Sequence, residues 1–149
     1  MHVAIILGSK SDMEHAQKIA DFLKDFDVQS EIIVASAHKV PEKVVEIIDT
    51  LNARKDATVV ITVVGMSNGL GGVVAGGCVH PVIACPPFKD HADYLVNVHS
   101  SLQMPSDVPV MTVLHPKNAA LSALRILGES DAGLKEKLLK RIVKIKAEY

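Results

Sequence analysis

Hydrophobic residues recur along the chain in five short, almost unbroken runs that are separated by longer amphipathic stretches. The runs are rich in valine and isoleucine and cover His2–Leu7, Glu31–Ala35, Ala57–Val64, Pro81–Cys85 and Pro109–Leu114. A continuous apolar run is typical of a parallel strand buried on both faces, whereas an antiparallel sheet with one wet face alternates apolar and polar residues. The pattern therefore predicts five parallel strands with helices on both sides.

The stretches between the runs have helical spacing. We expect a helix over Asp12–Phe26 with Asp12 as its cap, and a second helix with Pro41 in its first turn. A short glycine- and alanine-rich helix is expected over Asn68–Gly77, and a further one over Asn118–Gly128. Strands that alternate with helices predict right-handed crossovers and a three-layer, doubly wound α/β sheet with the flavodoxin-like order 2-1-3-4-5.

The C-terminal segment, residues 131–149, differs from the rest. Its apolar positions form one helical stripe, which consists of Leu134, Leu138, Ile142, Ile145 and Tyr149, and its other face is rich in lysine. A basic amphipathic helix can bind nucleic acid or a membrane surface. The whole chain, however, has 16 basic and 17 acidic residues and a formal net charge of -1. We therefore expect this helix to pack on its own domain or on a neighbouring subunit.

Composition narrows the class of protein. The 149 residues correspond to one domain, residues 1–149, and hydrophobic residues at 48% suffice for a core. Aromatic residues make up only 3% of the chain, so few side chains are available on which nucleic-acid bases could stack. No apolar run approaches the length of a membrane span, and Cys78 and Cys85 have neither disulfide nor zinc spacing. We expect a cytoplasmic protein that binds neither nucleic acid nor membrane.

The expected topology brings three loops to one crevice. Ligands of a doubly wound sheet bind at the carboxyl ends of the strands, where the winding reverses, here between the first and third strands. The first loop carries Ser9 and Ser11 beside a helix start, where free backbone N–H groups suit a phosphate. Asp12 would repel a phosphate and is better suited to ribose hydroxyls. The alternative is that Ser11 and Asp12 only cap the helix.

The second and third loops add further chemistry. Among seven histidines, His38 is best placed for proton transfer, and Lys39 beside it offers a point charge to a phosphate. The third loop is dense in glycine, which allows close backbone approach. With Ser36 and Ala37 of the second loop, its candidate binding residues are Gly65, Ser67, Asn68, Gly69 and Leu70. His80 and His115, near strand ends, have no acid or thiol partner at ligand spacing, so we expect no metal. The three loops together predict a small phosphorylated ligand and no cofactor.

These loops together resemble one family, the aminoimidazole ribonucleotide carboxylases and N5-carboxyaminoimidazole ribonucleotide mutases of purine biosynthesis. The resemblance extends from Gly8-Ser9-Lys10-Ser11-Asp12 through Ser36-Ala37-His38-Lys39 to the last helix. Lys39, Ser67-Asn68-Gly69-Leu70-Gly71 and Cys85-Pro86-Pro87 are like the carboxylase branch. The chain departs from that branch at Met66, where arginine is common, and at Gly72, where proline is common.

The resemblance implies a reversible reaction without ATP or metal, in which aminoimidazole ribonucleotide and CO2 give 4-carboxy-5-aminoimidazole ribonucleotide. It implies that His38 takes a proton from the carboxylated ring carbon and returns it in the reverse direction. Ser9, Ser11 and Lys39 would hold the 5′-phosphate and Asp12 the ribose. Donors to the developing carboxylate would be Ser36, Ser67 and Asn68. The resemblance also implies a symmetric homo-octamer.

Three other functions are weighed against this one. A mutase would move a carboxylate from the exocyclic nitrogen to the ring carbon of the same nucleotide, and it is the main alternative. A flavodoxin-like electron carrier would need aromatic residues beside a flavin, and the candidate loops contain none. A phospho-receiver switch would need carboxylates where the chain has Gly8-Ser9 and Gly65-Met66.

Overall fold

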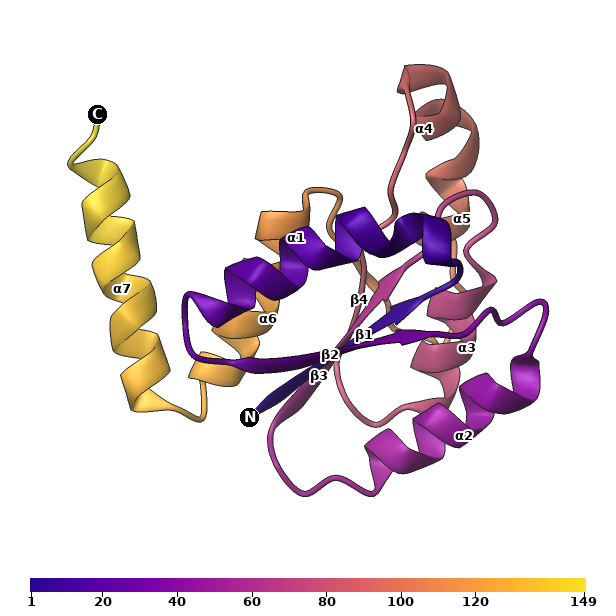
Figure 1. Ribbon diagram of the computed structural model, residues 1–149, viewed down its shortest axis with the longest axis horizontal. Helices are drawn as coiled ribbons and strands as arrows, with labels where there is room; N and C mark the ends of the chain where they lie inside the picture. Colours follow the sequence, from indigo (N-terminus) through magenta and orange to yellow (C-terminus); the bar gives the residue numbers. More distant parts are fainter.

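Five parallel strands form one sheet in the order β2-β1-β3-β4-β5, which confirms the predicted topology (Figure 1). The computed structural model describes residues 1–149. The strands are β1 (His2–Leu7), β2 (Gln29–Val34), β3 (Thr58–Val63), β4 (Val82–Ala84) and β5 (Met111–Thr112). The last strand is much shorter than the expected Pro109–Leu114, because it lies at the sheet edge and pairs only with the short β4.

The central strands set the level at which the loops leave the sheet. Along its whole length β1 pairs with β2 on one side and β3 on the other, and Leu7 is aligned with both Val34 and Val63. Every residue of β1 and β3 is buried. The loops that follow these three strands therefore start side by side at the carboxyl ends of the strands.

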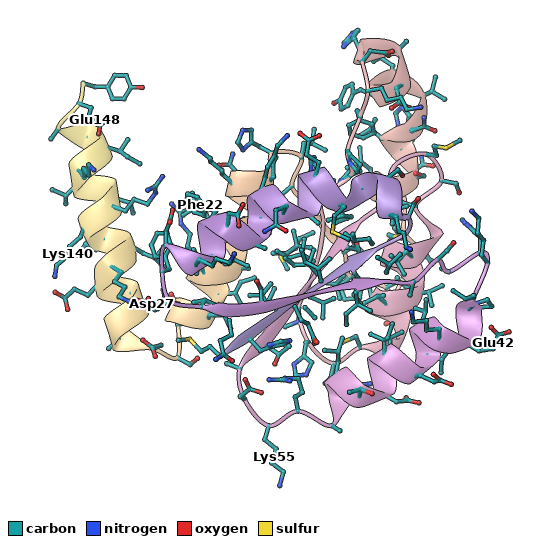
Figure 2. All side chains as sticks on the ribbon, viewed as in Figure 1. Phe22, Asp27, Glu42, Lys55, Lys140 and Glu148 are labelled. Carbon is teal, nitrogen blue, oxygen red and sulfur yellow. The ribbon has the colours of Figure 1, made fainter.

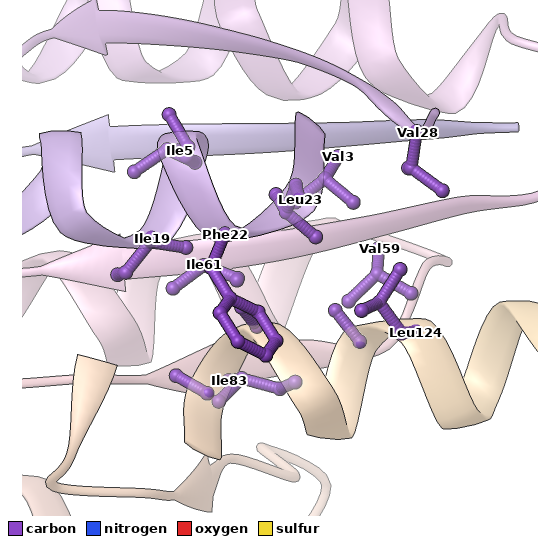
Figure 3. Close-up of a cluster of buried hydrophobic side chains, with 14 of the residues drawn as sticks. Val3, Ile5, Ile19, Phe22, Leu23, Val28, Val59, Ile61, Ile83 and Leu124 are labelled. Carbon is purple, nitrogen blue, oxygen red and sulfur yellow. The ribbon is translucent and has the colours of Figure 1, made fainter. Parts of the chain in front are cut away.

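Helices cover both faces of the sheet, as Figure 1 shows. One face carries α1 (Met13–Lys24) and α6 (Pro116–Gly128), and the other carries α2 (Pro41–Asn52) and α3 (Gly69–Gly77). Side chains of β1 alternate between the two layers, with Ile5 in the α1/α6 core and Ile6 in the α2/α3 core. Figure 3 shows Ile5 packed with the helix residues of the larger core.

Two helix starts differ from the expected ones. A short 3-10 helix, η1 (Lys10–Asp12), precedes α1, and Ser9 caps it by accepting a hydrogen bond from the backbone N–H of Ser11. Asp12 is the N-cap residue of α1, as predicted, but its side chain makes no capping hydrogen bond. The helix α6 begins at Pro116 rather than at Asn118, because proline needs no N–H partner in a first helical turn.

Two short helices were not predicted. They are α4 (His91–Asn97) and α5 (His99–Leu102), which lie between β4 and β5, and α4 projects from the rest of the chain (Figure 1). The side chains of Leu95, Val96 and Leu102 are exposed, so the segment has no buried apolar stripe from which to recognise a helix.

The C-terminal helix α7 (Ala132–Lys146) packs on the domain along one side as far as Arg141, whose guanidinium lies 4.8 Å from the centre of the Phe22 ring. Leu134 and Leu138 are buried against the α1/α6 core, and Lys137 forms an ion pair of 2.7 Å with Asp27. Beyond these contacts the helix lies apart from the sheet, as the positions of Lys140 and Glu148 in Figure 2 show. None of the helices combines the length and the hydrophobicity that a membrane-spanning segment requires.

Candidate functional site

A cleft with a volume of about 590 Å³ opens at the carboxyl ends of the strands. The three predicted loops form part of its wall, and a fourth loop, which follows β4, forms the rest. The lining residues are Gly8, Ser9, Ser11, Asp12, Ser36, Ala37, His38, Lys39, Val64, Gly65, Met66, Ser67, Leu70, Pro87, Phe88, Lys89 and Asp93. All of the site residues predicted from the sequence, except two, therefore line this one cleft.

The first loop presents two hydroxyl groups at the mouth of the cleft. Ser11 Oγ donates a hydrogen bond of 3.0 Å to Ser9 Oγ, and both residues are exposed. The preceding Gly8 leaves no room for a side chain, because a methyl group there would lie 2.9 Å from Val64 Cγ2. The loops after β1 and β3 thus meet closely, and the serine pair is held beside the third loop.

Asp12 places a carboxylate in the same wall. Partial burial raises its pKa, and this effect is offset in part by hydrogen bonds from Ser11 and from the backbone at Ser9. The carboxylate is free of helix capping, as described above, so it remains available as a hydrogen-bond acceptor. A ribose hydroxyl is a suitable donor for it, whereas a phosphate is not.

His38 lies directly against the first residue of α3. A methyl group on Gly69 would be 2.7 Å from His38 Nε2 and 3.0 Å from His38 Cε1, so only glycine allows the ring to lie there. The backbone of the second loop is closed by a hydrogen bond of 2.9 Å from Val40 N to Ser36 O. The ring has no hydrogen-bond partner within the chain, so its nitrogens are available to a ligand.

The structure does not place Asn68 or Gly69 in the cleft wall. The Asn68 side chain is buried, accepts a hydrogen bond of 2.9 Å from Gly71 N and donates one of 2.9 Å to Ser101 Oγ. It therefore caps α3 and ties it to α5, while Gly69 lies behind the His38 ring. Ser67, which precedes them, is the exposed hydroxyl of the third loop that lines the cleft.

The fourth loop contributes residues that the sequence reasoning missed. Asp93 accepts hydrogen bonds from the backbone N–H of Lys89 (2.9 Å) and from Asn97 Nδ2 (2.6 Å), and these two contacts lower its pKa. Phe88 packs edge-to-face on Tyr94, with ring centroids 5.3 Å apart. This loop could have been predicted, because ligands of a doubly wound sheet bind at the carboxyl ends of the strands. The strand β4 is the neighbour of β3, so the loop that follows it starts beside the third loop.

The remaining histidines do not line the cleft. His15 Nε2 lies 3.3 Å from Cys85 Sγ, where burial lowers the pKa of His15 and raises that of the thiol to about 12. This keeps both groups neutral near neutral pH. His80 contacts the Leu51 carbonyl and His2 contacts Glu31, each at 2.9 Å. No three histidine, cysteine or acidic side chains form a group that could hold a metal ion.

Comparison with known proteins gives consistent matches over nearly the whole chain. Residues 2–148 match the protein-family model described as AIR carboxylase. The phosphoribosylaminoimidazole carboxylase of Archaeoglobus fulgidus is 44% identical over 139 residues, which are 93% of this chain and 76% of that protein. The N5-carboxyaminoimidazole ribonucleotide mutase of Methanocaldococcus jannaschii is 42% identical over 146 residues, 97% of this chain and 90% of that protein. The crystal structure of Treponema denticola PurE superposes with a TM-score of 0.93 at 39% identity, covering 99% of this chain and 92% of that one.

Proposed function

The chain belongs to the AIR carboxylase family, and from this we propose that it catalyses the reversible carboxylation of 5-aminoimidazole ribonucleotide by CO2, without ATP, in purine biosynthesis. The observation that carries the proposal is the His38 ring, which lies unpartnered against Gly69 in a cleft whose walls offer hydroxyl and ammonium groups. The named relatives include a carboxylase and a mutase. The resemblance of Lys39 and residues 67–71 to the carboxylase branch favours the first.

The reaction needs a base at the ring carbon. The enamine electron pair of the aminoimidazole forms the new carbon–carbon bond to CO2, and one C–O π pair moves to oxygen to give the carboxylate. The ring carbon still bears its hydrogen, so a base must take that proton and leave the C–H electron pair to the aromatic ring. We assign this step to His38, since imidazole can both accept and return a proton near neutral pH. In the reverse direction His38 protonates the ring carbon before CO2 leaves.

The other cleft residues are assigned by chemistry. Ser9, Ser11 and Lys39 hold the 5′-phosphate, and Asp12 accepts hydrogen bonds from the ribose. Ser36 and Ser67 donate to the developing carboxylate, and Asn68 positions that region by capping α3. The backbone at Gly65 and the apolar side chains of Ala37 and Leu70 complete the surface that contacts the aminoimidazole ring of the nucleotide.

The test of this function is an assay without ATP in which either aminoimidazole ribonucleotide with bicarbonate or the N5-carboxylated isomer is supplied. We expect the carboxylated ring product from the first pair, and loss of CO2 from that product in reverse. Turnover of the N5-carboxylated isomer alone would make the protein a mutase. Absence of turnover with both substrates would contradict the assignment to this chemistry.

We also propose that the enzyme acts as a homo-octamer and that the exposed side of α7 contacts a neighbouring subunit. Leu139 and Val143 are each 61% exposed on this side, and apolar side chains exposed in a row are typical of subunit contacts. The proposed cytoplasmic location stays a prediction, supported by Cys78 and Cys85, which are both free thiols.

Val143→Glu tests this assembly. We expect the unaltered protein to have the mass of eight chains in solution, and the variant to form smaller species, because a carboxylate in an apolar contact must lose its hydration. Light scattering or sedimentation measures the mass, and Lys144→Gln on the same helix serves as the control. An unchanged mass for Val143→Glu, or a monomeric unaltered protein, would contradict the proposed contact.

A further inference from the structure

Two lysines of the cleft wall have ammonium groups without an internal partner. Lys39 and Lys89 are the only lysine or arginine residues in the wall, and neither forms an ion pair or a side-chain hydrogen bond. Of the two wall carboxylates, Asp93 already accepts hydrogen bonds on both of its oxygens, and the charge of Lys89 helps to lower the pKa of Asp93 without forming an ion pair with it. The cleft therefore presents two exposed positive charges that are free to bind anions.

These charges face the cleft from opposite sides. Lys39 follows β2 and Lys89 belongs to the loop after β4, while β1 and β3 lie between these strands. With a spacing of about 4.8 Å between neighbouring strands, β2 and β4 are roughly 14 Å apart. His38 and Gly69, which are in contact, lie in the loops that follow β2 and β3, between the two lysines. The two lysines are therefore placed for two separate anionic groups on either side of the reacting centre.

The backbone at Lys89 is fixed, so its side chain has a defined starting point. Its N–H donates to Asp93 Oδ2 (2.9 Å), and Asp93 is itself held by Asn97. The loop approaches β3 closely, since a methyl group on Gly65 would lie 3.1 Å from Pro87 O. The neighbouring Met66 is 72% exposed and uncharged. Lys89 is thus the cation available on the β3–β4 side of the cleft.

We propose that Lys89 is a substrate-binding residue that pairs with the carboxylate of the carboxylated nucleotide, while Lys39 pairs with the phosphate. This inference rests on the proposed function, in which the nucleotide carries one anionic group before the reaction and a second one after it. A cation that pairs only with the new carboxylate binds the carboxylated product more tightly than the substrate. Lys89 would then favour the carboxylated side of the equilibrium on the enzyme.

The experiment compares binding of aminoimidazole ribonucleotide and its ring-carboxylated product by calorimetry, with every variant made in the His38→Asn protein so that the product is not decarboxylated during the titration. For Lys89→Gln we expect affinity for the carboxylated nucleotide to fall roughly ten- to a hundredfold, as for loss of a charge-assisted hydrogen bond. Affinity for the uncarboxylated nucleotide should change by less than about threefold. Lys39→Gln should weaken both nucleotides equally, because both carry the phosphate.

Two further variants complete the design. Lys89→Arg keeps the charge, so it should retain the preference for the carboxylated nucleotide. Lys55→Gln removes a lysine that precedes β3 at the opposite edge of the sheet (Figure 2) and should leave both affinities unchanged. An equal loss for both nucleotides in Lys89→Gln, no loss in that variant, or an arginine variant that behaves like the glutamine variant would each overturn the inference. If the unaltered protein binds neither nucleotide, the proposed function fails first and the inference with it.

Discussion

The His38→Asn enzyme is expected to lose turnover in both directions by roughly 10²- to 10⁴-fold, which is the usual contribution of a positioned acid or base. Asparagine keeps a polar side chain of smaller size, so it fits beside Gly69 without a clash, but it cannot take up a proton from carbon. The walls that bind the phosphate and the ribose are unchanged. Nucleotide affinity should therefore stay close to that of the unaltered enzyme.

The measurements are the ATP-independent carboxylation rate, the decarboxylation rate and the nucleotide dissociation constant. His99→Asn is the matched control, because His99 is exposed and lies outside the cleft wall. A His38→Asn enzyme with normal turnover would remove His38 from the mechanism. A variant that fails to bind nucleotide would instead make His38 a binding residue.

Gly69→Ala is expected to reduce turnover by about 10²-fold with little change in the free energy of unfolding. The new methyl group would lie 2.7 Å from His38 Nε2, so the exposed ring must move away from the position it now occupies. A displacement of about 1 Å at a reacting group is sufficient for a rate loss of this size. The helix itself tolerates alanine, because the residue is the first of α3 and alanine is the best helix former.

The same helix supplies the control for this variant. A methyl group on Gly76 would meet only Val108 Cγ2 at 3.8 Å, an ordinary contact, so Gly76→Ala should leave turnover unchanged. Thermal unfolding and both reaction rates are measured for the two alanine variants. Full activity in Gly69→Ala would show that the close His38–Gly69 contact is not needed for catalysis. Loss of folding in that variant would contradict a local role for the glycine.

The fold could be predicted from the sequence because a strand that is buried on both faces has a continuous run of hydrophobic residues. The central strands of a doubly wound sheet are buried on both faces and therefore almost entirely apolar, and the run at His2–Leu7 matches β1 residue for residue. The unpredicted α4 shows the opposite case. Its apolar residues Leu95 and Val96 are exposed, so no periodic pattern distinguishes this helix from a loop.

The candidate site was readable in part, since strand order and loop position are linked in such a sheet. Three loops follow β1, β2 and β3, so residues such as Ser9, Lys39 and Ser67 could be assigned to one crevice before any coordinates. The role of Asn68 could not, because an exposed amide beside a ligand and a buried helix cap have the same sequence signature. Only the contacts with Gly71 and Ser101 distinguish the two.

Strand order, layers and the location of the cleft at the carboxyl ends of the strands follow from hydrophobic pattern and chain connectivity, which act over the whole chain. The residues that touch across the cleft became known only from the folded structure. The contact between His38 and Gly69 and the entry of Lys89 into the cleft join segments that are distant in sequence. Such contacts depend on side-chain packing at the ångström scale, and local sequence patterns do not specify it.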